Sequence, residues 1–297
     1  MKPHTRTSEA KRSRNRLFGV GVYLDNAAAT PTDSRVIRAM NEAYKKYGNP
    51  SSFNTMGRET RQDIESSRLT VARFLGARPD EIVFTGSGSE ANNLALLGLL
   101  RGRKGRVLTT PIEHPSVLEP LKSLRDIKVE YLKIDQKGIV DLESLEKSLA
   151  PDCLLISIMY ANNEIGTIEP IREISKIIKT HNLPAYRTGR QSSTRNKILL
   201  HVDACQAAGH LNMSVNHLGA DLLTFNGSKI YGPRGIGVLY VRRGVELKPL
   251  IYGGSQEKGL RAGTENAAAI IGLAKAISLP KFTVYRWQSL EIMRLRK

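Results

Sequence analysis

The chain has 297 residues, of which 40% are hydrophobic and 25% charged, the composition of an ordinary globular protein. Its composition excludes a membrane-spanning class and a disulfide-stapled class, because no apolar run reaches membrane length and only two cysteines are present, which favours a reducing cytoplasm. The formal net charge of +17 is concentrated in residues 1–20, 184–200 and 281–297. Such runs are typical of solvated tails and loops, so we expect no nucleic-acid groove, although a transient contact with RNA or an acidic protein stays open.

The first predicted elements are a tail and two helices. Residues 1–20 show no apolar periodicity and are predicted to form a disordered basic tail, and the folded domain is predicted to occupy residues 21–276. Apolar spacing predicts helices over 34–47 and 60–75, and Gly76 is a suitable stop for the second.

The next stretch predicts an anion site. Residues 81–93, EIVFTGSGSEANN, are typical of a strand, a glycine-rich turn and a helix, so backbone amides and the positive end of a helix dipole would face one anion. Gly86, Gly88 and Ala91 also satisfy the pattern of a dinucleotide-binding turn. That alternative requires an acidic residue at the end of the following strand, where this chain has PIEHPSV. We therefore expect a phosphate site, with dinucleotide binding as the alternative.

Strand-like runs then alternate with helix-like segments, which predicts βαβ units and a mostly parallel sheet. Ligands bind such sheets at the carboxyl ends of the strands. The polar motifs TGSGSE, EHPSV, ANNEIG and DACQ each follow a predicted strand, so they are expected to gather at one edge. The polar and basic segment 184–197 is expected to be an exposed loop.

Lys229 follows the apolar run 222–225 and precedes a tight turn, which places it at the end of a strand. A desolvated lysine near a carboxylate such as Asp203 suits Schiff-base chemistry with a carbonyl cofactor, because its pKa can fall far enough to free the amine. A solvated loop lysine is the alternative. Strand alternation also places His201, Asp203 and Cys205 on one face, where a metal site is an alternative that lacks an evident fourth ligand.

Eight motifs in register resemble the class V aminotransferase family, and most closely its cysteine desulfurase branch. The resemblance runs from residue 23 to about residue 276, and the motifs read YLDNAAAT, GNPSS, TGSGSEANN, EHPSV, ANNEIGTIEP, HVDACQAAG, NGSKIYGPRGIG and GGSQEKGLRAGTEN. The resemblance implies an α/β transferase of fold type I that depends on pyridoxal 5′-phosphate. It implies a mostly parallel, seven-stranded sheet with helices on both faces, and a small C-terminal domain that we expect to be largely missing.

The resemblance also implies roles for the motif residues. Lys229 would bind the cofactor covalently and carry the substrate's Cα proton, Asp203 would bind the pyridine nitrogen, and His114 would stack on the ring and relay protons. One of two neighbouring amides, Asn162 in preference to Asn163, would bind the phenolic oxygen or the substrate carboxylate. The remaining contacts, to the phosphate or the phenolic oxygen, would come from Gly88, Ser89, Gln206, Asn226, Ser228 and, across a homodimer interface, Thr264. Asn226 and Ser228 stand where many members have hydroxyl and imidazole ligands.

The implied reaction removes sulfur from L-cysteine, giving L-alanine and an enzyme persulfide for iron–sulfur cluster or thio-cofactor assembly. A sulfur-acceptor or scaffold protein would be a further partner. Residues 277–297 do not resemble the family, and we expect the loop that carries its nucleophilic cysteine to be absent, since Cys153 and Cys205 both lie in strand-like runs. The alternatives are another class V lyase or transaminase, and a catalytically silent fragment or scaffold.

Overall fold

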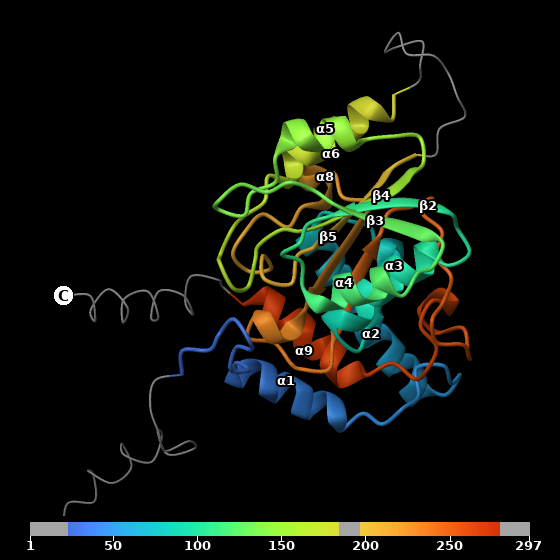
Figure 1. Ribbon diagram of the computed structural model, residues 1–297. Helices are drawn as coiled ribbons and strands as arrows, with labels where there is room; N and C mark the ends of the chain where they lie inside the picture. The colour runs from blue at the N-terminus through green and yellow to red at the C-terminus, as the bar shows by residue number, and fades with distance from the viewer. Residues whose placement is uncertain (1–22, 184–196, 280–297) are drawn as a thin grey trace, which may run out of the picture.

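A seven-stranded sheet forms the centre of the computed structural model, which describes residues 23–183 and 197–279 (Figure 1). The strand order is β1-β7-β6-β5-β4-β2-β3, and only β7 runs antiparallel to its neighbours. The prediction of a mostly parallel sheet is therefore confirmed. The strands are β1 (Ile82–Thr85), β2 (Gly105–Thr109), β3 (Ile127–Tyr131), β4 (Cys153–Met159), β5 (Leu199–Asp203), β6 (Leu222–Asn226) and β7 (Gly237–Val241).

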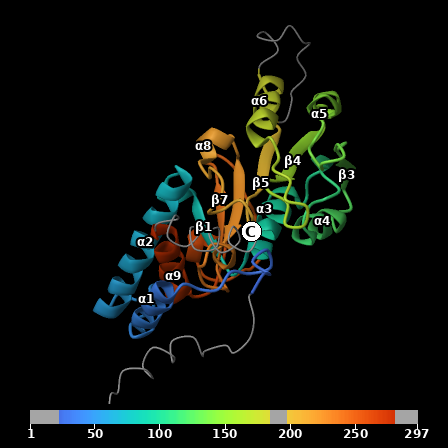
Figure 2. The same cartoon turned by 90° about the vertical axis from the view of Figure 1, so that its left-hand side faces the viewer.

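Helices cover both faces of the sheet, because successive strand residues point to opposite sides. In β1, Ile82 and Phe84 belong to one apolar layer and Val83 to the other. The second layer contains α3 (Gly88–Leu100) and α4 (Pro115–Lys122). The first layer contains α9, which packs against α1 and α2 (Figures 1 and 2). Its helices are α1 (Ser34–Tyr44), α2 (Thr55–Leu75), α5 (Leu142–Ser148), α6 (Ile171–His181), α8 (Val215–Leu218) and α9 (Ala267–Ser278).

Local chemistry moves several boundaries away from the predicted ones. Helix α2 begins five residues earlier than predicted, because the side chain of Asn54 accepts a hydrogen bond from the N–H of Gly57 (2.8 Å). It ends as predicted at Gly76, whose φ of 63° is left-handed. Helix α1 ends at Tyr44, three residues earlier than predicted, and a Cβ on the following Gly48 would lie 2.3 Å from the backbone of Met56. Strand β7 was not predicted, although all five of its residues are buried.

The predicted tail at 1–20 and most of the insertion at 184–197 lie outside the described residues. The domain limits at 21–276 and 277–297 stay predictions, and the structure describes the second segment only as far as residue 279. Within the described ranges, the helices are all too short or too polar to cross a membrane.

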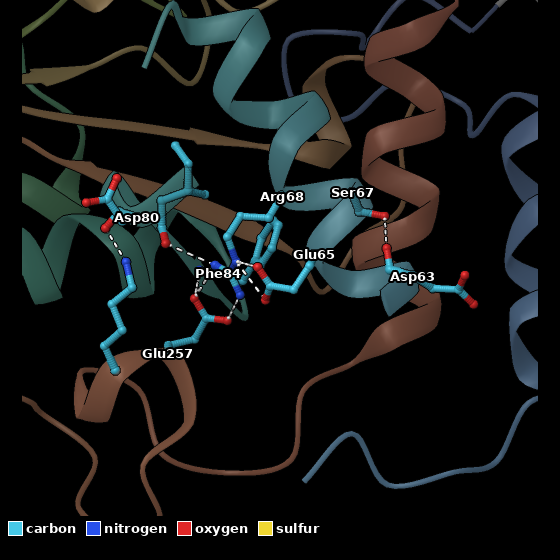
Figure 3. Close-up of polar contacts among 9 residues, drawn as sticks. Asp63, Glu65, Ser67, Arg68, Asp80, Phe84 and Glu257 are labelled. Carbon is cyan, nitrogen blue, oxygen red and sulfur yellow. Dashed lines mark hydrogen bonds and ion pairs between the residues drawn. The ribbon is translucent and has the colours of Figure 1, made fainter. Parts of the chain in front are cut away.

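A buried ion pair fixes the loop that follows β7 to the sheet (Figure 3). The Arg68 guanidinium contacts both carboxylate oxygens of Glu257, at 2.7 and 2.8 Å, and donates to the carbonyl of Ile82 (3.0 Å). The same carboxylate accepts the backbone N–H of Phe84 in the edge strand β1 (2.9 Å). These bonds hold Glu257 at a φ of 46°, which an ordinary side chain rarely adopts. The ion pair thus anchors the 255–260 loop against β1.

Replacing one member of this pair tests its contribution to stability. We expect Glu257→Gln to lower the free energy of unfolding by about 3–5 kcal/mol, because Arg68 would keep a buried charge without its buried counter-ion. Glu65 is the other acidic residue that contacts Arg68, and the Glu65 side chain is 55% exposed. Glu65→Gln should therefore lower the free energy of unfolding by less than about 1 kcal/mol. Urea denaturation of both variants makes the measurement. Equal losses would show that the buried pair does not anchor the loop.

Candidate active site

A cavity of about 580 Å³ lies where the strands end. Strands β1, β2, β4, β5 and β6 point the same way, so the segments that follow them meet at one edge of the sheet. A turn near the N-terminus closes the cavity on another side. The lining residues are Asp25, Ala27, Ala28, Ser87, Gly88, Ser89, His114, Ser116, Met159, Ala161, Asn163, Asp203, Cys205, Gln206, Asn226, Ser228 and Lys229.

The glycine-rich turn after β1 forms the anion-binding end. Ser87 caps α3 by accepting the N–H of Glu90 (3.0 Å), which leaves the N–H groups of Gly88 and Ser89 without partners within the helix. A Cβ on Gly88 would lie 2.7 Å from the sulfur of Cys205. Only a glycine therefore lets the first turn of α3 approach the end of β5 this closely. Backbone donors and the helix dipole make this place suited to a phosphate.

A buried carboxylate and a desolvated amine occupy the middle of the cavity. Asp203 ends β5 and is 5% exposed, and its oxygens accept hydrogen bonds from Cys205 N (3.0 Å) and Asn92 Nδ2 (2.7 Å). Lys229 follows β6, and its Nζ donates to the carbonyl oxygens of Ala27 and Ala28, both at 2.5 Å. Burial lowers the pKa of Lys229, while the nearby thiol and carboxylates oppose that shift. A lowered pKa makes the free amine, the form that a nucleophile needs, easier to reach.

Smaller polar side chains complete the wall. His114 caps α4, since its Nδ1 accepts the N–H of Ser116 (3.1 Å). Gln206 donates from Nε2 to the carbonyl of Ala27 (2.9 Å). Ser228 donates to the side-chain oxygen of Asn226 (3.0 Å), and both side chains line the cavity near the glycine-rich turn.

Two predicted residues lie away from the wall of this cavity. Asn162 donates to the carbonyl of Ile112 (2.9 Å) and accepts two backbone N–H groups at 2.8 and 2.9 Å, so its amide is used inside the loop. Asn163 lines the cavity in its place. Thr264 is exposed and lies outside this chain's own cavity. The roles predicted for Asn162 and Thr264 stay predictions.

The metal alternative finds no support in the described ranges, where no group of three His, Cys, Asp or Glu side chains could hold an ion. His201 is buried and hydrogen-bonded instead to Ser157 (2.8 Å) and Thr224 (3.3 Å), and burial lowers its pKa to about 4. It therefore fills the sheet interior as a neutral ring.

Sequence reasoning missed several wall groups. Asp25 and the two carbonyls that bind Lys229 come from DNAAAT, whose place among the family motifs was the available signal. Asn92 and Ser116 lie in the motifs TGSGSEANN and EHPSV, but their positions inside helical stretches did not indicate which side chains they contact.

The fold and the cavity together define an α/β protein of fold type I. A model of the family described as "Aminotransferase class-V" matches residues 22–284. The cysteine desulfurase IscS of Dictyoglomus turgidum is 47% identical over 264 residues, which are 87% of this chain and 63% of that protein. A solved NifS-like protein is 41% identical with a TM-score of 0.80, covering 90% of this chain and 71% of its own. A structure titled "SspA in complex with cysteine" is 37% identical with a TM-score of 0.77, over 86% and 72% of the two chains.

The chain belongs to the class V aminotransferase family, as the motifs predicted. It spans 63% of the length of the Dictyoglomus turgidum relative. Members of this family depend on pyridoxal 5′-phosphate. The cavity fits that cofactor, because it combines an amine of lowered pKa, a buried carboxylate for a ring nitrogen and an anion-binding turn.

Glu113, the residue before His114, is a buried acid beside this cavity. Its Oε1 accepts hydrogen bonds from Thr110 (2.7 Å) and from the N–H of Met159 (3.0 Å), while its Oε2 has no partner in the described part of the chain. Burial raises the pKa of Glu113 to about 8, and these two hydrogen bonds oppose the shift. The folded protein therefore holds a proton on this carboxyl at neutral pH.

Because the pKa of Glu113 is raised from 4.5 to about 8, the free energy of unfolding is expected to depend on pH. The contribution of the protonated carboxyl is fully present below pH ~4.5 and is lost as the pH rises through ~8. We expect the permanently neutral Glu113→Gln to be spared this loss, which is worth roughly 5 kcal/mol. Denaturation at pH ~5 and pH ~9 measures it, with the exposed Glu119→Gln as control. Parallel stability curves for wild type and Glu113→Gln would contradict the assignment.

Proposed function

We propose that the cavity binds pyridoxal 5′-phosphate and L-cysteine, and that the chain performs the cofactor-dependent part of cysteine desulfuration. The observation that carries the proposal is the meeting of Lys229, Asp203 and the amides of Gly88 and Ser89 in one cavity. The relatives named cysteine desulfurase and the solved structure titled as a complex with cysteine support this choice of substrate.

Several cavity residues have a role in this proposal. Lys229 would bind the cofactor's aldehyde covalently and move the Cα proton of the substrate. Asp203 would hold the ring nitrogen and His114 would contact the ring. When bound, the cofactor supplies an electron sink for the substrate's Cα. The phosphate is held by Gly88, Ser89, Asn226 and Ser228, and the phenolic oxygen by Gln206.

The thiolate that accepts sulfur is proposed to come from a cysteine other than the two in this sequence. Burial raises the pKa of Cys153 to about 11 and that of Cys205 well above its ordinary value. Both groups stay thiols at neutral pH, and a thiol is a poor nucleophile. The same observation favours a second candidate, a class V lyase or transaminase that needs no persulfide.

The quaternary and cellular setting is also proposed by resemblance. A homodimer would bring Thr264 of one protomer to the phosphate of the other, in keeping with its exposed position. A sulfur-acceptor or scaffold protein would take the product, and two free cysteines suit a reducing cytoplasm.

Removing the amine tests the cofactor assignment. We expect wild type loaded with pyridoxal 5′-phosphate to show a visible absorption band that survives removal of free cofactor, and Lys229→Ala to lose it. Lys258→Ala is the matched control, because Lys258 is another lysine whose pKa is lowered by burial, but it lies outside the cavity. Identical spectra for wild type and Lys229→Ala would overturn the role of Lys229.

Adding L-cysteine to the loaded protein tests the reaction. We expect the visible band to change, and alanine and sulfide to form in equal amounts when a thiol reductant is present to accept the sulfur. Conversion of L-cysteine to pyruvate and ammonia would favour the lyase. No spectral change with L-cysteine would contradict the proposed substrate.

A further inference from the structure

A line of polar side chains connects the two walls of the cavity from behind. The amide nitrogen of Asn92, in α3, donates to Oδ2 of Asp203 (2.7 Å) and to Oγ of Ser116 (2.9 Å). The hydroxyl of Ser116, in α4, lies 2.8 Å from Nδ1 of His114. Asp203 and His114 are thus joined through two side chains that have no role in the proposed function.

The direction of each hydrogen bond along this line follows from chemistry. A carboxylate only accepts, so Asp203 fixes the amide of Asn92 with its NH2 group inward. Asn92 is 1% exposed. Its amide nitrogen donates both hydrogens, to Asp203 and Ser116, while its amide oxygen accepts no hydrogen bond in the described ranges. The oxygen of Ser116 therefore receives one of these hydrogens. Its own hydrogen is left for Nδ1 of His114.

A second donor acts on the same ring nitrogen. The backbone N–H of Ser116 donates to Nδ1 of His114 (3.1 Å), because His114 is the N-cap of α4. A proton on Nδ1 would oppose this N–H and displace the hydroxyl. The ring proton is thereby placed on Nε2, which has no hydrogen-bond partner in the part of the chain that the structure describes and belongs to a ring that lines the cavity.

We infer that Asn92 and Ser116 are positioning residues through which Asp203 locks His114 in the Nε2–H tautomer. In this state His114 offers the cavity a hydrogen-bond donor and no free acceptor nitrogen. Resting on the proposed function, the inference adds that His114 binds an oxygen of the bound amino acid or cofactor, and that the mobile Cα proton is left to Lys229. The resemblance alone had implied a proton relay for His114.

Nitrogen NMR on the full chain with 15N-labelled histidine tests the inference, because the two ring nitrogens have different shifts in the two tautomers. The His114 signals are assigned by their loss in His114→Gln. In wild type we expect an unprotonated Nδ1 and a protonated Nε2. Ser116→Ala should lower the ratio of the Nε2–H to the Nδ1–H tautomer about fivefold, the effect of one ordinary hydrogen bond. The 15N chemical shift of Nδ1 should also change to that of a ring nitrogen that accepts only the backbone N–H of Ser116.

Three further variants separate this role from a structural one. Ser116→Thr keeps the hydroxyl and should restore the wild-type signals. Ser123→Ala removes a hydroxyl from the other end of α4, where it donates to the carbonyl of Pro120, and should leave His114 unchanged. Asp203→Asn should shift the His114 nitrogens in the same direction as Ser116→Ala, since it frees Asn92 to turn.

Some results would overturn the inference. They are a protonated Nδ1 in wild type, or His114 signals in Ser116→Ala that match those of wild type even if that variant is less stable. Recording the spectra before and after addition of pyridoxal 5′-phosphate keeps the two proposals apart. A chain that binds no cofactor but shows the locked tautomer would refute the proposed function and leave the positioning of His114 by Asn92 and Ser116 standing.

Discussion

The register of β5 and β6 is the constraint on which the site depends. Asp203 pairs with Thr224, so the carboxylate stands beside the strand that delivers Lys229 a few residues later. Asp203 is buried and Lys229 is partly buried, so protein groups rather than water supply most of their hydrogen-bond partners. These groups are the backbone carbonyls of Ala27 and Ala28, the N–H of Cys205 and the amide of Asn92. The same burial lowers the pKa of the amine.

Helix α3 links the parts of the site to one another. Its first turn presents free N–H groups at the anion end, and its second turn carries Asn92 to Asp203. Glu90, between them, accepts the N–H of Gly86 (2.8 Å) and the guanidinium of Arg261 (2.9 Å). Arg261 directly follows the 255–260 loop, which Arg68 and Glu257 anchor to β1. Helix α3 therefore contacts the glycine-rich turn, the carboxylate of Asp203 and Arg261, three residues before Thr264.

Much of this arrangement could be predicted from the sequence, because the rule that ligands bind at the carboxyl ends of parallel strands needs only strand patterns. Lys229, Asp203 and the glycine-rich turn were placed together in this way. Asn92 and Ser116 lie in two of the quoted motifs, but their partners could not be predicted, because a polar residue inside a helix acquires its partner only when the helix packs in the fold. Neighbouring Asn162 and Asn163 point to different surroundings, and a loop sequence does not decide which of two adjacent amides turns inward. The left-handed backbone at Glu257 could not be predicted either, because the residue at that position is not a glycine.

The central claim is that the amine of Lys229 captures an aldehyde beside a carboxylate and an anion cradle. Its most direct test is reduction of the cofactor-loaded protein with borohydride, followed by digestion and mass spectrometry of the peptides. The account predicts a reduced pyridoxyl phosphate group on Lys229 alone. A label on another lysine, or no label on a protein that has bound the cofactor, would contradict it.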